Sequence, residues 1–198
     1  MTDLGFHPSY NLNDTNFDQM YPIRIQKLSK MHWTPIEIAN KAAKFLAYRP
    51  GIKVLDIGSG VGKFCLVGAN NHPDVSFYGV EQRLNLYQHA ICAKEEIQLN
   101  NVEFIHGNFT QLDLNDYQSF YFFNSFYENI DHTEQIDHQI EHSYSLYQYY
   151  STFLLNALDD KPSGTRLVTY HSSRHEIPNS YHLVGLPIHP WLKMWIKM

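Results

Sequence analysis

The stretch VLDIGSGVGKF, residues 54–64, joins two different hydrophobic patterns. An apolar, β-rich run gives way to glycines at positions 58, 60 and 62, and a helical pattern follows. A glycine turn between a strand and a helix brings bare backbone close to a ligand. The dinucleotide fingerprint G-x-G-x-x-G needs its third glycine where Lys63 stands, so its spacing is not met. The stretch predicts either a ligand site of another kind or a tight turn that only packs helix on strand.

Strand-like and helical patterns alternate along the chain on both sides of this turn. Apolar, β-rich runs are separated by stretches with helical period. The expected strands are 52–57, 75–81, 102–106, 119–126 and 166–171, and the expected helices are 34–48, 62–70, 83–99 and 142–158. The connection 109–118 is too short for more than a turn or a brief helix. This alternation predicts a doubly wound α/β fold whose mostly parallel sheet is covered on both faces.

The two ends of the chain follow other patterns. Residues 1–32 have neither helical nor strand period, and we interpret them as a flexible or lid-like extension. The run TPIE that follows predicts a capping box with Thr34 as N-cap and Glu37 bonding back. The last two apolar runs, 181–186 and 192–197, have no helix between them, which predicts an antiparallel pair at one edge of the sheet.

Size and composition fit a soluble, cytoplasmic protein. The 198 residues suffice for one core, which we place in 33–198. A net charge of −5 gives no general attraction to a phosphate backbone, although a local basic patch stays possible, so we expect no nonspecific nucleic-acid binding. Cys65 and Cys92 have neither zinc nor disulfide spacing, which favours a reducing compartment. No apolar run approaches the roughly 20 residues that span a bilayer.

An acid two residues before the first glycine makes the turn similar to motif I of the class I methyltransferases, which use S-adenosylmethionine (SAM). The resemblance covers about residues 33–130 and implies a seven-strand sheet with an antiparallel last pair. SAM carries a positive sulfonium and an amino group, so Asp56 suits it. The resemblance extends to Glu81, where the family places an acid for ribose hydroxyls, and to GNF at 107–109, which resembles the family's adenine-binding G-D-[FL] step.

The resemblance therefore implies a cofactor site along the carboxyl ends of the strands. Asn108 replaces the family's usual Asp, but an amide oxygen can still accept a bond from the adenine amino group. By analogy, Thr34 would approach the carboxylate end of the cofactor. Plain alternatives are an N-cap for Thr34, a turn residue for Asn108 and a helix-start charge for Glu81. The residues assigned to the cofactor are Thr34, Asp56, Gly58, Ser59, Gly60, Gly62, Glu81, Gln82, Asn108, Phe109 and Asn124.

The turn NSFY at 124–127, after the fourth expected strand, is the candidate acceptor site. It resembles N-P-P-[YF] of amino-group nucleic-acid methylases and N-N-F-x-F of the non-SET histone-lysine methyltransferases, and it matches neither fully. In both families the Asn holds an attacking amine in line with the methyl group. The resemblance thus implies catalytic roles for Asn124, Phe126 and Tyr127. The glycine turn is close to D-L-G-S-G-V-G of the lysine enzymes, which makes protein lysine the first expected acceptor.

Other acceptors and roles stay open. A small-molecule or RNA-base methyltransferase would use the same fold, and so would a SAM-binding module without catalysis. His138 and His142 have a spacing that can bind a metal on one helix face, but no further ligand completes a site. We therefore expect no metal. His106, inside an expected strand, is interpreted as structural.

Overall fold

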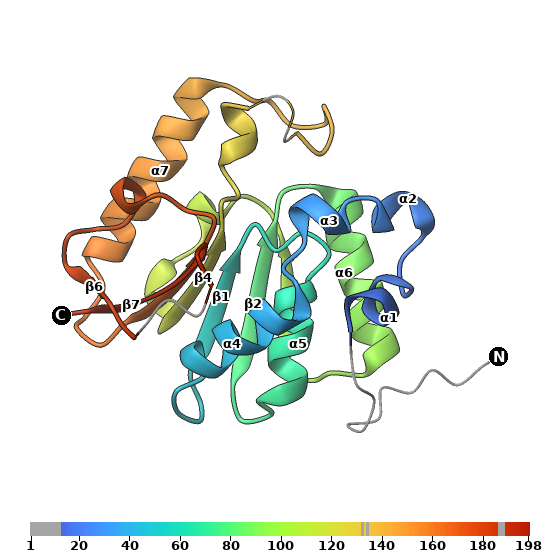
Figure 1. Ribbon diagram of the computed structural model, residues 1–198, viewed down its shortest axis with the longest axis horizontal. Coiled ribbons are helices and arrows are strands. Elements are labelled where there is room, and N and C mark those ends of the chain that lie inside the picture. Colours follow the sequence, from blue (N-terminus) through green and yellow to red (C-terminus); the bar gives the residue numbers. More distant parts are fainter. Residues whose placement is uncertain (1–12, 132, 134, 186–188) are drawn as a thin grey trace.

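A seven-stranded sheet forms the centre of the molecule (Figure 1). The computed structural model describes residues 13–131, 133, 135–185 and 189–198. The strands are β1 (Lys53–Ile57), β2 (Ser76–Glu81), β3 (Val102–His106), β4 (Ser119–Phe123), β5 (Arg166–Tyr170), β6 (Tyr181–Leu183) and β7 (Leu192–Lys197). Their spatial order is β3-β2-β1-β4-β5-β7-β6; β1 to β5 are parallel, and β7 is antiparallel to both neighbours. The predicted doubly wound sheet with an antiparallel last pair is confirmed.

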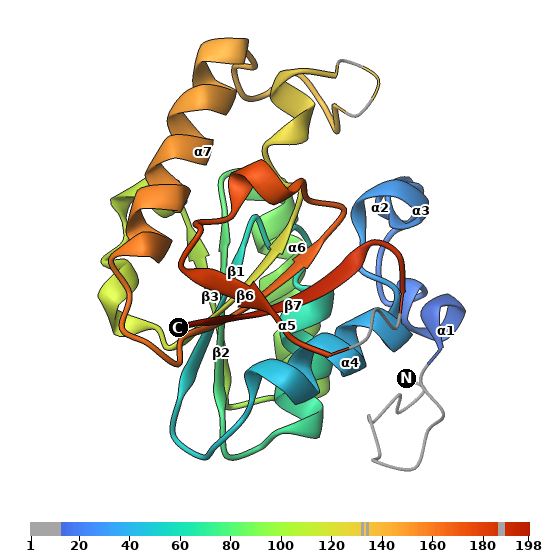
Figure 2. The same ribbon diagram turned by 60° about the vertical axis from the view of Figure 1, so that its left-hand side comes forward.

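Helices cover both faces of this sheet. They are α1 (Asp14–Asp18), α2 (Ile23–Gln26), α3 (Ser29–His32), α4 (Ile36–Leu46), α5 (Lys63–Asn71), α6 (Leu84–Ile97) and α7 (Tyr144–Asp159). Short 3-10 turns are η1 (Phe109–Gln111), η2 (Leu114–Asp116), η3 (Tyr127–Asn129) and η5 (Arg174–Glu176). Helices α4, α5 and α6 pack on one face, and α7 packs on the other, so that strands lie between them (Figure 2).

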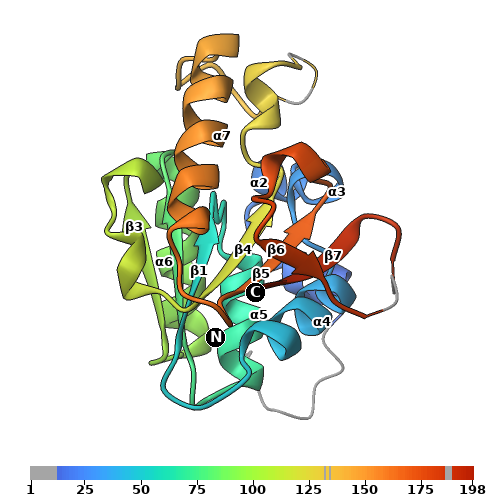
Figure 3. The same cartoon turned by 90° about the vertical axis from the view of Figure 1, so that its left-hand side faces the viewer.

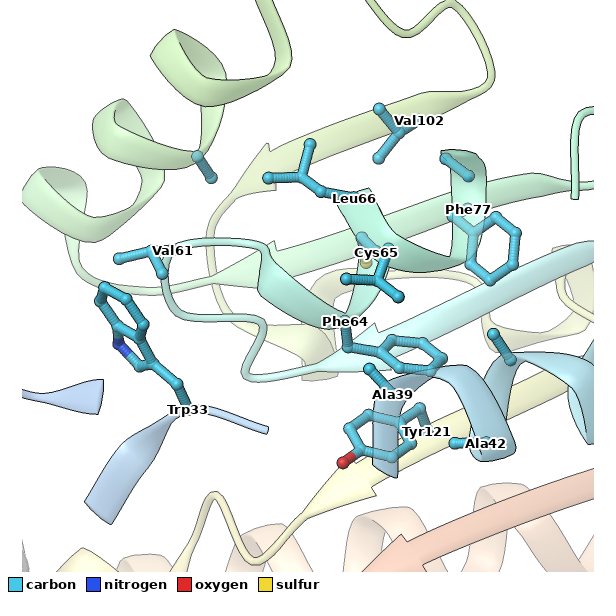
Figure 4. Packing of buried hydrophobic residues seen from close by; sticks show 14 of the residues in the cluster. Trp33, Ala39, Ala42, Val61, Phe64, Cys65, Leu66, Phe77, Val102 and Tyr121 are labelled. Atoms are coloured by element: carbon cyan, nitrogen blue, oxygen red, sulfur yellow. The ribbon is translucent and has the colours of Figure 1, made fainter. Parts of the chain in front are cut away.

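Each face of the sheet has its own apolar core. Under α4 and α5, the rings of Phe64 and Tyr121 stack with their centroids 4.0 Å apart, next to the small side chains of Ala39 and Ala42 (Figure 4). On the other face, strand residues such as Phe120 pack in a second cluster that includes buried residues of α7. Burial on both faces explains why the parallel strands are apolar throughout rather than alternating.

Residues 13–32 differ most from the expected structure. We expected a flexible or lid-like extension, and the described part instead forms the three short helices α1 to α3. Phe17, Tyr21 and Ile25 are buried in the core beside Trp33. Helices of four or five residues are too short to produce a hydrophobic period, which is why the pattern shows none. Residues 1–12 of the expected extension lie outside the described residues.

The start of α4 also corrects the predicted capping box. The helix begins at Ile36, and Thr34 does not cap it; the Thr34 hydroxyl instead hydrogen-bonds the Tyr121 hydroxyl at 2.8 Å. The backbone N–H of Ile36 donates to Oδ1 of Asp14 at 3.0 Å. The free N–H at this helix start is therefore satisfied by a carboxylate from α1, which no local pattern could indicate.

Other elements agree with the prediction except at their ends. Strand β4 ends at Phe123 rather than 126, because Asn124 adopts a left-handed conformation with φ 40°. The expected connection 109–118 forms the turns η1 and η2. Strand β6 covers Tyr181–Leu183 of the expected run 181–186, whose last residue lies outside the described residues. Among the described residues, no helix has both the length and the apolar character to cross a membrane.

Candidate functional site

The glycine turn after β1 combines tight packing with open backbone. Gly58, Gly60 and Gly62 all have left-handed φ angles, at 77°, 55° and 84°. A Cβ atom would lie 2.4 Å from Ser125 Oγ at Gly58 and 2.3 Å from Phe104 Cζ at Gly62. At Gly60 it would meet no atom within 4 Å. Two glycines therefore let other elements approach, and the middle one leaves free space in front of the backbone.

That free space belongs to a cavity at the carboxyl ends of β1, β2 and β4. Together with the open solvent at its mouth, it encloses about 900 Å³. It lies where the strand order reverses between β1 and β4, the usual ligand position in open α/β sheets. The predicted site residues that line it are Gly58, Gly60, Glu81, Gln82, Phe109, Asn124, Phe126 and Tyr127.

A smaller cavity of about 320 Å³ adjoins it under α3 and shares Gly58, Trp33 and Phe123 with it. This cavity brings together three further predicted residues, Thr34, Asp56 and Ser59. Gly62 lines neither cavity, because it packs against Phe104 of β3.

Asp56 is a buried carboxylate in this smaller cavity, 4% exposed. Burial raises its pKa well above the usual range, and the nearby Glu81 raises it further. Only the Cys65 thiol donates to it, at 3.7 Å, and no described residue forms an ion pair with it. The hydroxyl of Ser59 is also buried and has no partner among the described residues. The cavity therefore presents one acidic and one neutral polar group that an ammonium ligand would satisfy.

Glu81 fastens the glycine turn to the end of β2. Its Oε2 accepts from the Gly60 N–H at 3.0 Å, and its Oε1 accepts from the Arg83 N–H at 2.7 Å. Burial raises the pKa of Glu81, and the two backbone donors and the Arg83 charge oppose that shift. The same carboxylate lines the larger cavity, so it holds the turn and also faces a ligand.

The structure uses Asn108 differently from the predicted adenine acceptor. Its Oδ1 accepts from the N–H and the hydroxyl of Thr110, at 3.1 and 3.0 Å, and caps η1. Its amide nitrogen donates to Gln82 Oε1 at 3.0 Å and to the Tyr150 hydroxyl at 2.9 Å. Asn108 does not line the cavity, whereas Phe109 does. The turn-residue alternative therefore describes Asn108 better, and its contact with Gln82 makes it a support for a lining residue.

The turn after β4 presents Asn124 to the cavity and holds it there. The Ser125 hydroxyl donates to the carbonyl of Ile57 at 2.7 Å, which ties the turn to the end of β1. Phe126 is buried, and its ring stacks on Phe109 with centroids 5.1 Å apart. Tyr127 is 39% exposed and lines the mouth. Phe126 is thus a packing residue of the cavity wall, and Asn124 and Tyr127 are the more accessible groups.

Arg83 was not identified from the sequence as part of the site. It is 4% exposed, and its guanidinium donates to both carboxylate oxygens of Glu128, at 3.0 and 2.7 Å. Its Nε donates to Asp137 at 3.1 Å. His142, considered above as a metal ligand, contacts Glu128 at 3.4 Å instead. This network ties the segment after β4 to the turn that follows Glu81, and only the long-range fold brings its members together.

Lys63 was also missed, and it docks the N-terminal helices on the glycine turn. Its buried ammonium binds the carboxylates of Asp14 at 2.7 Å and Asp18 at 2.9 Å. The rings of Phe17 and Trp33 lie 5.1 and 5.5 Å from the ammonium nitrogen. The Tyr21 hydroxyl donates to the carbonyl of Val61 at 3.0 Å. The segment that precedes α4 therefore forms part of the site wall.

Comparison with known proteins shows that the chain is similar to methyltransferases. A family model described as "Putative methyltransferase" matches residues 51–122, from β1 to β4. A tRNA (guanine-N(7)-)-methyltransferase of Synechococcus sp. (strain JA-3-3Ab) is 46% identical over 54 residues, which are 27% of this chain and 23% of the relative. The chain spans about a quarter of the length of the curated relatives it matches.

Solved structures share the fold over most of the chain. An RNA methyltransferase from Salinibacter ruber, in complex with S-adenosyl-L-homocysteine, covers 83% of this chain and 91% of its own at a TM-score of 0.56 and 19% identity. Magnesium protoporphyrin IX methyltransferase from Synechocystis PCC 6803, with bound SAM, covers 94% and 93% at 0.58 and 14%. The chain has the class I methyltransferase fold. The expected likeness to the histone-lysine enzymes is not confirmed by these matches.

Proposed function

We propose that this chain is a SAM-dependent methyltransferase that acts on a nitrogen atom of an RNA base. The observation that carries the proposal is the junction of the two cavities at the glycine turn, with Asp56 and Ser59 in one and Glu81 and Asn124 in the other. The family match over 51–122 and the relatives that act on tRNA support the same activity.

The residues present fit SAM. The buried carboxylate of Asp56 lacks a positive partner among the described residues, and the amino group of SAM would supply one. Ser59 would bond the same end of the cofactor, since its hydroxyl is buried without a partner. Glu81 would hold the ribose, and Gln82 and Phe109 would border the adenine. When bound, SAM supplies a methyl group activated by a positive sulfur.

An RNA base replaces protein lysine as the proposed acceptor. The enzymes that match this chain in sequence act on tRNA guanine. The family match ends at 122, just before Asn124, so the turn that would hold the acceptor lies outside it. The proposal of an RNA base as acceptor therefore depends on the relatives and on the surface beside the cavity. Protein lysine is the competing acceptor that the experiment below distinguishes.

Catalysis would come mainly from orientation. The left-handed backbone at Asn124, tied to β1 through Ser125, fixes the direction of the Asn124 amide at the cavity. That amide would hold the base so that the lone pair of the acceptor nitrogen lies in line with the methyl group. Tyr127 would lie against the acceptor at the mouth. An exocyclic amine would pass its proton to water at the open mouth, whereas a ring nitrogen such as guanine N7 carries no proton and the methylated base would be cationic.

The cofactor is tested by calorimetric titration of the purified chain with SAM, S-adenosylhomocysteine and NAD. We expect micromolar binding of the first two and none of NAD, because the glycine spacing lacks the dinucleotide fingerprint. A folded protein that binds neither SAM nor S-adenosylhomocysteine would contradict the proposed function.

The acceptor is tested with SAM carrying a tritiated methyl group, offered with unmodified tRNA and, separately, with total cell protein. Asn124→Asp keeps a residue that tolerates the left-handed conformation and removes the amide donor. We expect label in tRNA, at least tenfold slower transfer by Asn124→Asp, and unchanged SAM affinity. Label found only in protein would contradict the RNA acceptor and favour protein lysine. SAM binding without methyl transfer to either substrate would indicate a SAM-binding module.

A further inference from the structure

The surface of α2 and α3 carries a row of positive side chains beside the mouth of the larger cavity. Arg24, Lys27 and Lys30 are all exposed. Lys27 and Leu28, which join α2 to α3, also have right-handed helical backbone, so a spacing of three residues places the three side chains on neighbouring turns. We call these three residues the basic ridge. Ile23, 75% exposed, and Met31, 51% exposed, stand on the same surface.

The ridge is joined to the cavity through its own helices. Leu28, Met31 and His32, which alternate with the ridge residues, line the larger cavity. Buried Ile25 anchors the same segment in the core, and the Lys63 contacts hold α1 beneath it. Figure 3 shows α2 and α3 at the end of the sheet where the segment after β4 also lies. The ridge therefore has a defined position relative to Asn124.

The charges of the ridge are available to a partner. None of the three forms an ion pair with a described residue. The acids nearest along the chain, Asp18 before the ridge and Glu37 after it, are already bound to Lys63 and Lys41. The charged groups elsewhere in the lining include Arg83 and Glu128, which pair with each other, and Arg83 also binds Asp137. Among the described residues that line or border this cavity, the positive charges without an ion pair are therefore those of the ridge, although the whole chain carries −5.

We infer that the basic ridge binds the phosphate backbone of the RNA whose base enters the cavity. This inference rests on the proposed function and names how the same site holds its substrate. A polyanion that follows the surface of α2 and α3 would gain three contacts with positive side chains that form no ion pair with a described residue. The phosphate contacts would set the position of the strand without reading its sequence. The exposed Ile23 and Met31 would cover the base edges that follow.

The experiment uses the full chain, charge-reversed at the ridge (Arg24→Glu, Lys27→Glu and Lys30→Glu). The matched control reverses Lys44, Arg49 and Lys94, which lie toward the amino ends of the strands and change the net charge equally. Binding of a fluorescein-labelled oligouridylate and of unfractionated tRNA is measured by anisotropy at several salt concentrations. SAM binding by calorimetry verifies that each variant keeps its fold.

We expect the ridge variant to bind RNA at least tenfold more weakly with unchanged SAM affinity, and the control to match the wild type. Each lost contact to a single strand should reduce the slope of log K against log salt by about 0.7, so the slope should fall by about 2. Equal RNA affinity in the ridge variant and the wild type would overturn the inference and leave the proposed function standing. Displacement of the RNA by polyglutamate at equal charge concentration would also overturn it, in favour of an acidic protein partner. A wild type that binds SAM but no RNA would overturn both the ridge and the RNA acceptor.

Discussion

At the scale of single residues, Asp56 links cofactor affinity to the stability of the protein. Its pKa is raised in the folded state, so between the unfolded and folded pKa values the folded protein binds more protons. The stability contributed by protonated Asp56 is therefore present at low pH and lost as pH rises through that window. A cation bound beside the carboxylate would oppose this loss.

Asp56→Asn should remove that pH dependence and weaken SAM binding. Loss of a bond to a charged group costs about 1.5–3 kcal/mol, or roughly 10- to 150-fold in affinity. Melting temperature against pH and calorimetry measure the two effects. Ser59→Ala is the control in the same cavity, because it removes a neutral hydroxyl and should leave the pH dependence intact. An Asp56→Asn variant with wild-type SAM affinity would show that the carboxylate does not contact the cofactor.

Alanine substitutions in the glycine turn should distinguish a glycine needed for packing from the glycine that leaves room for a ligand. Gly60→Ala requires a left-handed alanine, which costs about 1–2 kcal/mol, and places its methyl group in the open space of the cavity. Gly51→Ala is matched to it, since φ is 78° and the Cβ meets no atom within 4 Å, but it lies before β1. Both should lose similar stability in urea, and only Gly60→Ala should lose SAM affinity.

Gly62→Ala should behave differently from both. Its Cβ would lie 2.3 Å from the Phe104 ring, so overpacking of about 1–3 kcal/mol adds to the cost of the left-handed backbone. Stability should fall further than in Gly60→Ala, as measured by the urea midpoint. Equal urea midpoints for the two variants would mean that the Phe104 ring moves aside without a measurable loss of stability.

At the scale of elements, the attachment of α1 depends on one buried ammonium group. Asp14→Asn with Asp18→Asn leaves Lys63 buried without a partner and should cost about 3–5 kcal/mol. Lys63→Met removes the charge instead and should cost less, because Asp14 is 51% exposed and remains hydrated, so that Asp18, 16% exposed, is the one partner left partly buried. Asn is chosen so that an oxygen at position 14 still caps α4. Urea unfolding compares the variants; equal losses would indicate that the charge of Lys63 is not what holds α1.

The same elements show what the sequence predicts and what it does not. The strands and the helices between them follow from hydrophobic period and from the glycine turn, because these signals are local. The capping of α4 by Asp14, the anchoring of α1 by Lys63 and the Arg83 network depend on residues far apart in the chain. The candidate site residues at strand ends follow from the same local signals as the strands, and their roles stay predictions. Asn108 was assigned from its position alone, and its side chain caps η1 instead.

At the scale of the whole molecule, SAM should stabilise the fold and slow hydrogen exchange at the carboxyl ends of the parallel strands. Saturation at about 100 times Kd adds about 2.7 kcal/mol, which for this size raises Tm by about 5–10 °C. Hydrogen exchange should slow at 58–62 and 124–127 and stay unchanged in β6, at the far side of the sheet. Slowing spread evenly over all strands would mean that SAM binds elsewhere or only stabilises globally.

The order of the strands has a consequence for the chain as it leaves the ribosome. β6 is made before β7, but among the described elements it pairs with β7 alone, and β7 lies between it and β5. The first helices likewise emerge some 45 residues before Lys63, their buried anchor. A nascent chain arrested after β5 would therefore already contain the parallel strands and the glycine turn of the proposed cofactor site. The edge of β5 that pairs with β7 would still be unpaired. The half of the molecule that would bind SAM can thus form during synthesis, and the last edge closes after it.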